Sequence, residues 1–347
     1  MENTIKTLNL LKLSTLLTLL ILSACRTDKS QLSPEAFPNL SGAYLGQNLP
    51  DTIPGLFANN IVSTDMFTRD VAISPDGKEI YWGVSLGNYK YTTIVFSREV
   101  AGQWTRPELV AFSGGPGIMD LEPAFSPDGS RLYFLSTRPD GDEEVGDQDI
   151  WYVERQGEGW GEAVNPGAPL NTDGGEFFPS LTEKGTLYFT RNEKGSRLNQ
   201  VFRSQLVDDV FQEPELLPEE VNCGTNRFNA FVAPDESYII VPAAGMEDAF
   251  DGVDYYIVFR NARDHWSKPV NLGKAVNDNN ARGWSPYVSP DGKAFFFMAV
   301  RPGELDPSQW NYETLQKYQQ GPENGNSDIY WMDASFIEDL KKSSPYS

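Results

Sequence analysis

The chain has 347 residues, which is long enough for one large domain with a sizeable hydrophobic core or for two smaller domains. Its 49 acidic and 28 basic residues give a net charge of −21, and repulsion between this charge and phosphate groups argues against nucleic acid as a partner. Aromatic residues make up 12% of the chain, and there are 30 glycines and 24 prolines. This composition is typical of many short strands joined by turns and not of a helical protein.

The first 24 residues predict a signal peptide. Lys6 and Lys12 precede an apolar run at residues 13–22, which is shorter than the ~20 residues that a membrane-spanning helix needs. The run ends in Leu-Ser-Ala-Cys, with the cysteine at position 25, and this segment resembles the lipobox of bacterial lipoproteins. The resemblance implies cleavage before Cys25 and acylation of that cysteine, for example by palmitate. It also implies membrane attachment through the lipid and a location at the outer membrane, facing the periplasm or the exterior.

Residues 25–48 are polar, contain Ser, Pro, Gly and Asn, and show no sustained hydrophobic period. We therefore expect a flexible tether between the lipidated cysteine and the folded body, and we assign residues 49–340 to that body. Once Cys25 carries a lipid, Cys223 is the one cysteine left, so no disulfide can form within the chain. We expect Cys223 to be a small buried hydrophobic residue.

One turn recurs along the body. The sequence Ser-Pro-Asp-Gly occurs at residues 74–77, 126–129 and 289–292, and altered copies occur at residues 182–185 and 233–236. Proline fixes φ at about −65°, aspartate bonds back to the backbone and glycine accepts a positive φ, so each copy predicts a tight turn between two strands. The second residues of the five copies are 52, 56, 51 and 56 residues apart. A period of that length predicts a propeller or a solenoid.

Each copy of the turn lies in a unit with the same order of segments. A short strand precedes the turn, an aromatic-rich strand follows it, and a third strand is aromatic and β-branched. In four of the units, an aromatic residue three positions before Pro or Ala then leads into a fourth, outer strand. Four antiparallel strands make a propeller blade. We therefore predict an all-β fold, a five-bladed β-propeller of four-stranded antiparallel blades, with six blades as the alternative.

The ends of the body predict how the ring closes. The fifth unit ends at Met332 and runs into a short helical pattern at residues 335–340, without the signal for a fourth strand. Residues 54–64 start 21 residues before the turn proline Pro75, which is also the spacing between Pro269 and the last turn proline. We therefore predict that residues 54–64 supply the fourth strand of the last blade. Such a closure hides two sheet edges that would otherwise pair with other chains.

The turn, the aromatic second strand and the segments Asp149-Ile150-Trp151 and Asp328-Ile329-Tyr330 resemble the TolB-type, WD-like propeller repeat over about residues 50–335. The resemblance implies the propeller fold and an envelope-assembly setting, but it does not include the additional N-terminal domain of TolB. Such propellers serve as scaffolds, enzymes and accessory domains, so the repeat leaves the activity open. Asp149, Asp254 and Asp328 recur before the third strand, and we predict that they bond to nearby backbone N–H groups.

Polar residues are predicted to converge at one mouth of the central channel, on the face opposite the turns. The first strands begin there and carry Asp70, Asp120, Glu122, Glu176, Arg227, Asn229, Arg282, Trp284 and Ser285. In one interpretation, Asp70, Glu122 and Glu176 are catalytic carboxylates of a carbohydrate-active hydrolase or lyase. The ligand-binding candidates are Asp120, Arg227, Asn229, Arg282 and Trp284. In the other interpretation, which we favour, polar residues only line a water-filled mouth, because the repeat places some residue there whatever the function.

Acidic loops on the same face contain candidate ligands for a metal ion. Asp140, Asp142 and Asp147 are the candidates for calcium, which prefers clustered oxygen ligands, but their spacing does not match a Ca²⁺-binding loop. We therefore expect solvated surface and no cofactor. The sequence has a single histidine, His265, which excludes a multi-histidine zinc site and argues against a Ser-His-Asp triad.

The fifth unit contains the longest insertion, residues 302–327. Residues 307–319 predict a helix with Asp306 as its cap and Pro307 at its first position. Aromatic and apolar residues recur along this helix: Trp310, Tyr312, Leu315 and Tyr318. Two interpretations stay open, a lid or partner-docking element and a helix packed against its own blade.

These observations favour a monomeric, non-catalytic envelope lipoprotein. Its propeller would be a binding scaffold for a protein or for a cell-wall component such as a saccharide, on the acidic face that carries the channel residues. The alternative is a carbohydrate-active hydrolase or lyase that uses Asp70, Glu122 and Glu176. No phosphate-binding glycine loop or esterase nucleophile motif occurs in the sequence.

Overall fold

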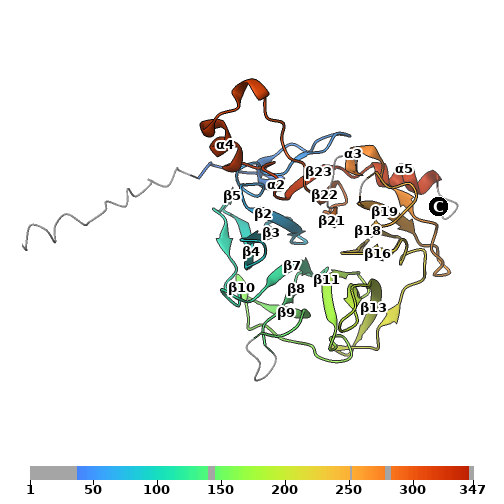
Figure 1. The fold of residues 1–347 in the computed structure, drawn as a ribbon. Coiled ribbons are helices and arrows are strands. Elements are labelled where there is room, and N and C mark those ends of the chain that lie inside the picture. Colours follow the sequence, from blue (N-terminus) through green and yellow to red (C-terminus); the bar gives the residue numbers. More distant parts are fainter. Residues whose placement is uncertain (1–36, 140–144, 251, 278–282, 344–347) are drawn as a thin grey trace, which may run out of the picture. The chain divides into compact units, whose positions relative to one another are not determined.

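The computed structural model describes residues 37–139, 145–250, 252–277 and 283–343. The chain divides into two compact units, Met1–Asn39 and Leu40–Ser347, and every described strand lies in the second. These strands form five antiparallel sheets, which follow one another in chain order around a common centre (Figure 1). The predicted all-β class and the five-bladed propeller are confirmed.

In the first three blades, the first strand lies at the centre of the ring and the later strands lie successively closer to its rim. Blade 1 contains β2 (Phe67–Ile73), β3 (Glu79–Leu86), β4 (Tyr91–Val100), β5 (Gln103–Trp104) and β6 (Glu108–Leu109). Blade 2 contains β7 (Asp120–Phe125), β8 (Arg131–Ser136), β9 (Asp149–Gln156) and β10 (Gly159–Trp160). Blade 3 contains β11 (Gly175–Leu181), β12 (Thr186–Asn192), β13 (Asn199–Val207), β14 (Val210–Phe211) and β15 (Glu215–Leu216).

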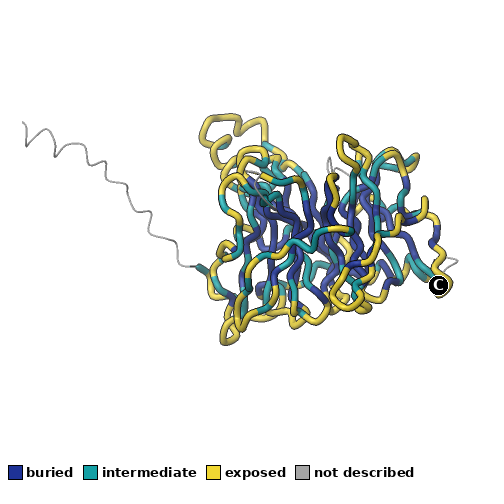
Figure 2. The backbone as a smooth tube through the Cα atoms, turned by 90° about the horizontal axis from the view of Figure 1, so that it is seen from below, coloured by how far each residue is buried: buried dark blue, intermediate teal, exposed yellow. Residues whose placement is uncertain are grey.

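The last two blades complete the ring. Blade 4 contains β16 (Asn226–Arg227), β17 (Phe231–Val232), β18 (Tyr238–Ala244), β19 (Val253–Phe259) and β20 (Val270–Asn271). Blade 5 contains β21 (Trp284–Val288), β22 (Ala294–Ala299), β23 (Asp328–Asp333) and the N-terminal strand β1 (Gly55–Leu56). The innermost strands of neighbouring blades touch all round the ring, including β21 with β2. Figure 2 shows the buried backbone along the strands and the exposed backbone in the loops at their ends.

The predicted closure by an N-terminal strand is present, but the strand is shorter than predicted. Gly55 pairs with Trp331 and Leu56 with Tyr330, both on β23. The next residue, Phe57, donates its backbone N–H to the Ile329 carbonyl at 2.8 Å, and its fully buried ring packs against Phe296 and Trp331 with ring centroids 5.0 and 5.1 Å away. The closure thus depends on a buried aromatic anchor more than on strand pairing.

Residues 40–48, which the sequence assigns to the tether, pack against the propeller. The Leu40 carbonyl accepts a hydrogen bond from the Trp104 backbone N–H at 2.9 Å, and the Gly42 carbonyl accepts one from the Trp104 indole at 2.8 Å. Leu45, in the short turn α2 (Ala43–Gly46), is buried in the core that blades 1 and 5 share. The Tyr44 hydroxyl donates to Asp291 in the last turn at 2.7 Å. The folded body therefore begins at Leu40.

A β-bulge interrupts the first strand of blades 1, 2, 3 and 5. The bulge residues Asp70, Glu122, Phe178 and Ser285 have φ between 54° and 62°, a left-handed conformation that costs energy for residues other than glycine. In blade 4, Asn229 holds the same place, between β16 and β17. All five positions precede the second residue of the recurring turn by five residues. Bulges re-aim side chains, and here they do so at the same point of every blade.

The structure contains few helices among the described residues. The insertion predicted as one helix forms two pieces, η1 (Pro307–Gln309) and α4 (Tyr312–Gln319). Asp306 caps the first as predicted, but Asn311 caps the second by accepting from the Thr314 N–H at 3.0 Å, which separates the two. The predicted C-terminal helix is present as α5 (Phe336–Ser343), and α3 (Lys274–Asn277) is a single turn. None of the described helices is long and apolar enough to cross a membrane.

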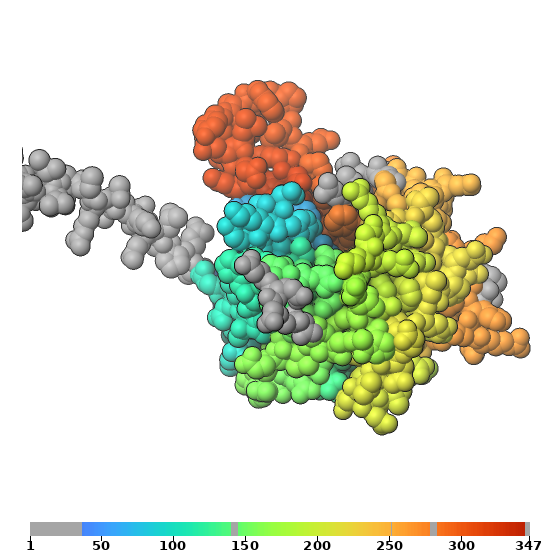
Figure 3. Space-filling model, turned by 60° about the horizontal axis from the view of Figure 1, so that its bottom comes forward, coloured from blue at the N-terminus to red at the C-terminus, as the bar shows by residue number. Residues whose placement is uncertain are grey.

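The insertion projects from the body in Figures 1 and 3, where α4 lies beyond the ring. Trp310 and Tyr312 are 69% and 75% exposed, and Leu315 is 38% exposed. The helix therefore leaves these side chains in solvent, which argues against the interpretation in which they pack on their own blade.

Candidate functional site

The bulges bring polar side chains from four blades to the centre of the ring. The Arg69 guanidinium donates to Asp70 Oδ2 and to Glu122 Oε1, both at 2.6 Å. Asn229 donates to Glu122 Oε1 at 2.9 Å, and the Ser285 hydroxyl donates to Asp70 Oδ1. These five residues, here named the central polar ring, are 2–6% exposed. Blade 3 completes the circuit through its backbone, because the Phe178 N–H donates to Glu122 Oε2 at 2.7 Å.

The central polar ring contains two carboxylates and one guanidinium. Burial disfavours the charged form of Glu122 and raises its pKa to about 7, and the neighbouring Asp70 carboxylate adds to this rise against the pull of Arg69. With both carboxylates ionised, the Arg69–Asp70–Glu122 cluster carries one uncompensated negative charge. A proton on Glu122 removes it.

The structure places the candidate residues of the sequence in three groups. Asp70, Glu122 and Asn229 meet in the central polar ring together with Ser285. Trp284 lies beside it, with the Arg69 guanidinium 5.8 Å from its ring centroid. Arg69 was not among the sequence candidates, although it directly precedes Asp70 in the first strand and its charge is the natural partner for two converging carboxylates.

Asp120 and Glu176 lie outside this ring and bond within their own blades. Asp120 accepts from Ser136 at 2.7 Å and from Arg138 at 2.8 Å. Glu176 accepts from the Thr172 hydroxyl at 2.7 Å and from Arg191 at 2.8 Å. Each arginine also donates to a backbone carbonyl in the connection from the preceding blade. Both acids therefore fasten one blade to the next.

The remaining candidates are dispersed. Arg227 is buried, donates to the Cys223 carbonyl at 3.4 Å and has a pKa lowered by burial. Arg282, Asp140 and Asp142 lie outside the described residues.

No metal-binding arrangement occurs in the part of the chain that the structure describes. Those residues contain no group of three or more His, Cys, Asp or Glu side chains that could hold a metal ion. Asp147 lines a polar groove of about 680 Å³ between blades 2 and 3, together with Gln148, Thr172 and Asp173.

The recurrent aspartates before the third strand have structural partners. Asp254 accepts from the Phe250 N–H at 2.8 Å, and Asp328 accepts from the Glu323 N–H at 2.7 Å, as predicted. Asp149 accepts a hydrogen bond from the Asn165 side chain at 2.9 Å.

A preformed cavity of about 320 Å³ opens on the face that carries the recurring turns, and we name it the turn-face funnel. Its rim is exposed and contains the second residue of every turn: Pro75, Pro127, Glu183, Pro234 and Pro290. Its walls include three further prolines and three aromatic residues: Pro123, Pro179, Pro286, Phe125, Phe231 and Tyr287. Asp70 and Ser285 of the central polar ring form its buried floor.

Two further cavities extend the funnel across the same face. One of about 560 Å³ lies toward blades 2 and 3 and shares Pro127 and Glu183 with the funnel. The other, of about 310 Å³, lies toward blades 5 and 1 and shares Pro75 and Pro290. Sequence reasoning expected a site on the opposite face and missed this one. The recurring turn proline was the sequence signal for this cavity. Five blades that surround one centre bring their five equivalent turns together on one face.

No protein-family model and no curated protein matches the sequence. Among solved structures, TolB from Acinetobacter baumannii matches with a TM-score of 0.45 and 15% identity, covering 77% of this chain and 57% of TolB. The catalytic domain of Coprinopsis cinerea GH62 alpha-L-arabinofuranosidase matches with a TM-score of 0.46 and 8% identity, covering 81% and 92%. The K499G mutant of NanB sialidase from Streptococcus pneumoniae matches with a TM-score of 0.39 and 10% identity, covering 71% and 36%. The chain thus spans little more than half the length of TolB. At such identities the similarity concerns the fold and assigns no function.

Proposed function

We propose that this chain is a non-catalytic binding protein of the bacterial cell envelope. In this proposal a lipid on Cys25 attaches it to the outer membrane, and the propeller holds a partner protein at the turn-face funnel. One observation carries the proposal. The described carboxylates that could have been catalytic are bonded within the protein, whereas the funnel is open and already formed.

The bonding of the carboxylates counts against the hydrolase or lyase alternative. A general acid or nucleophile must reach the substrate within hydrogen-bonding distance. Glu122 is 3% exposed, and both of its oxygens accept hydrogen bonds from the protein. Glu176 is fully buried against Arg191 in blade 3, outside the central polar ring. These contacts count against Asp70, Glu122 and Glu176 as the carboxylate pair that retaining and inverting glycosidases place on either side of a sugar.

The lining of the funnel favours a protein side chain over a saccharide. Proline and aromatic walls are rigid and apolar, and a preformed apolar pocket reduces the entropy cost of binding. A cavity of about 320 Å³ has room for one or two inserted side chains. Among the described residues, no amide or basic side chain lines the funnel and could bond to sugar hydroxyls.

Site-specific photo-cross-linking in the source bacterium tests the proposal. A photoreactive phenylalanine analogue at position 183, on the funnel rim, is expected to give a discrete protein adduct. The same analogue at position 173 is the matched control, because Asp173 has an 87% exposed side chain and lies before the first strand of blade 3, on the opposite face. The adduct from position 183 should disappear when Ala124, in the funnel wall, is changed to tryptophan.

Three results would overturn the proposal. One is an adduct from position 173 that equals or exceeds the adduct from position 183. Another is an adduct from position 183 that survives Ala124→Trp in a variant with unchanged thermal unfolding. The third is turnover of a chromogenic glycoside or polyuronate by the purified protein that Glu122→Gln abolishes, because this would make the centre of the ring an active site.

A further inference from the structure

The lining of the turn-face funnel accepts hydrogen bonds but has few protons to give. Seven of its residues are prolines, which have no backbone N–H. Three of its four hydroxyl groups already donate within the protein, because Ser126 donates to Asp128, Ser285 to Asp70, and Tyr287 to the Ile73 carbonyl, whereas the fourth, Ser180, accepts from the Val232 N–H. A ligand that fills this cavity with good pairing must therefore bring the donors itself.

The charge of the lining has one sign. Its ionisable side chains are Asp70 at the floor and Glu183 at the rim, and no lysine, arginine or histidine contributes to it in the part of the chain that the structure describes. The Asp70 carboxylate is 1% exposed and is paired with the Arg69 guanidinium at 2.6 Å, so it acts on a ligand through the combined field of the Arg69–Asp70–Glu122 cluster, which solvent screens poorly at a buried site.

The adjoining cavities continue this pattern. Asp76, Glu99 and Asp291 line the cavity toward blades 5 and 1, where Lys78 is the basic residue. The basic residues of the cavity toward blades 2 and 3 are already paired, since Arg131 contacts Glu154 at 2.9 Å and Asp209 at 3.1 Å, and Arg155 contacts Glu79 at 2.7 Å. A negative potential therefore extends across the face, in a protein whose net charge is −21.

We propose that the turn-face funnel takes a basic side chain, lysine or arginine, from the partner protein. The alkyl part lies against the proline and aromatic walls, and the charged end is directed at the floor formed by Asp70 and Ser285. This inference rests on the proposed function and names the chemistry of the group that the funnel receives. An aliphatic cation fits because it combines the apolar stem that the walls bury with the donors and the positive charge that the floor and rim lack.

The central polar ring couples this binding to a proton. A cation above the floor stabilises the ionised form of Glu122, so binding releases the proton that Glu122 holds below about pH 7. The groups that face Glu122 are Arg69 and Asp70 from β2, Tyr89 after β3, the Phe178 N–H from β11, and Asn229. Binding of a cation should therefore strengthen as the pH rises from 6 to 8.

Calorimetric titration with two probes of equal length tests the inference on the purified wild-type body. The probes are n-hexylammonium chloride and n-hexanol, which differ in the charged end. We expect hexylammonium to bind about tenfold tighter than hexanol, the size of effect that one partly buried charge interaction gives. Asp70→Asn should remove that advantage and leave hexanol unchanged, and asparagine tolerates the left-handed backbone at this position. Asp173→Asn, on the opposite face, should change neither affinity.

Two further arms keep the test decisive if Asp70→Asn is unstable. The comparison of hexylammonium with hexanol needs no variant, and equal affinities in the wild type overturn the inference. In Glu122→Gln, hexylammonium binding should lose its rise between pH 6 and 8, and an unchanged rise would contradict the coupling. If neither probe binds while position 183 still cross-links to a partner, the basic-side-chain inference fails and the proposed function stands. If hexylammonium binds and no adduct forms from position 183, the proposed protein partner fails instead.

Discussion

Glu122 accepts hydrogen bonds from Arg69, Asn229 and the Phe178 N–H, yet burial raises its pKa from 4.5 to about 7. Between these two pH values the folded chain holds a proton that the unfolded chain has lost. The free energy of unfolding therefore falls as the pH rises from about 4.5 to about 7, by up to ~3 kcal/mol from this residue. Above pH 7 the contribution stays at its lower level.

Glu122→Gln removes this titration and should flatten the pH dependence of stability. We expect the difference in free energy of unfolding between wild type and variant to change by a few kcal/mol between pH 5 and pH 8, with the wild type losing stability. Urea unfolding at both pH values measures it. Asp173→Asn, at an exposed side chain, is the control and should follow the wild type. Parallel curves for wild type and Glu122→Gln would show that the carboxyl is not protonated in the folded chain.

At the scale of single elements, the N-terminal closure of the ring uses a very short strand. Strand β1 contributes two residues to blade 5, and most of its hold comes from the segment that follows. Ser63 bonds to both the N–H and the carbonyl of Ile329, at 3.2 and 3.1 Å. In blades 2, 3 and 4 the side chains of Asn171, Asn222 and Asn277 bond to Ile150, Val201 and Tyr255 in the same two-way manner. The N-terminal segment therefore imitates the outer part of an ordinary blade.

Phe57→Ala should destabilise the whole propeller, because it removes a fully buried ring that packs against Phe296 and Trp331. We expect a loss of ~3–5 kcal/mol in the free energy of unfolding, the usual range for deleting a core aromatic side chain. Ile53→Ala, four residues earlier and 80% exposed, is the matched control and should stay within ~0.5 kcal/mol of the wild type. Denaturant unfolding measures both. Equal stability of the two variants would mean that the closure contributes little to the fold.

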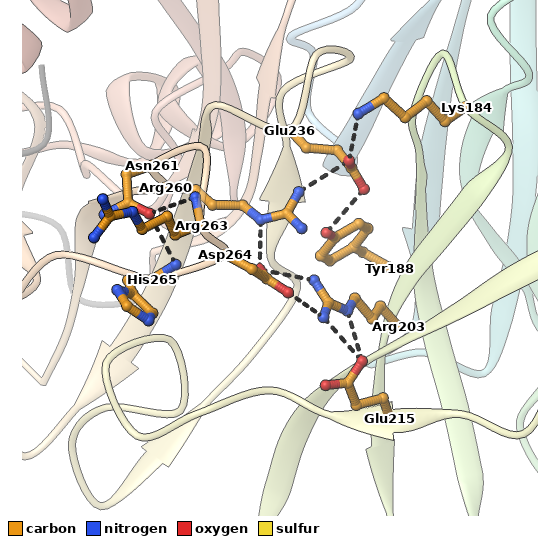
Figure 4. Close-up of polar contacts among 10 residues, drawn as sticks. All are labelled: Lys184, Tyr188, Arg203, Glu215, Glu236, Arg260, Asn261, Arg263, Asp264 and His265. Carbon is orange, nitrogen blue, oxygen red and sulfur yellow. Dashed lines mark hydrogen bonds and ion pairs between the residues drawn. The ribbon is translucent and has the colours of Figure 1, made fainter.

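At the scale of the whole molecule, ion pairs tie neighbouring blades together on the turn face. Figure 4 shows the network between blades 3 and 4, in which Arg203 of β13 contacts both Glu215 and Asp264. Arg260, which directly follows β19, contacts Asp264 at 2.6 Å and Glu236 at 2.9 Å. Lys184 of blade 3 reaches Glu236 of blade 4 at 3.4 Å. The paired arginines fix the orientation of one sheet against the next.

Asp264→Asn should weaken this boundary in a pH-dependent way. The hydrogen bond from Arg203, together with Arg260, lowers the pKa of Asp264 from 3.8 to about 2. The carboxylate therefore stabilises the fold above about pH 4, and this stabilisation is lost as the pH falls toward 2. We expect the thermal midpoint of the variant to lie a few degrees below the wild type at pH 7 and to match it near pH 2. Glu313→Gln breaks an exposed pair on α4 and should show no difference at either pH. A difference in thermal midpoint that persists at pH 2 would show that the substitution acts through packing and not through the charge of Asp264.

Several features of the structure were within reach of the sequence and were missed. Asn171, Asn222 and Asn277 are 51 and 55 residues apart, close to the period of the turns, and could have been read as a second repeat. The break between η1 and α4 was also signalled, because Asn311 is a strong helix cap. Arg69 could not have been paired with Glu122 in advance. The two residues are 53 positions apart, and their meeting depends on how neighbouring blades are placed.

The all-β class, the number of blades, the order of strands and the closure by the N-terminus could be predicted from the sequence. These follow from local chemistry, namely turn residues, aromatic strand segments and a constant period, which each unit expresses independently of the others. Two features could be seen only in the folded structure. The bulges bring the Asp70 and Glu122 carboxylates into contact with the Arg69 guanidinium, and a funnel opens on the turn face. Those features depend on the angle and distance between blades. They arise from packing among residues about 50 positions apart, which no local pattern encodes.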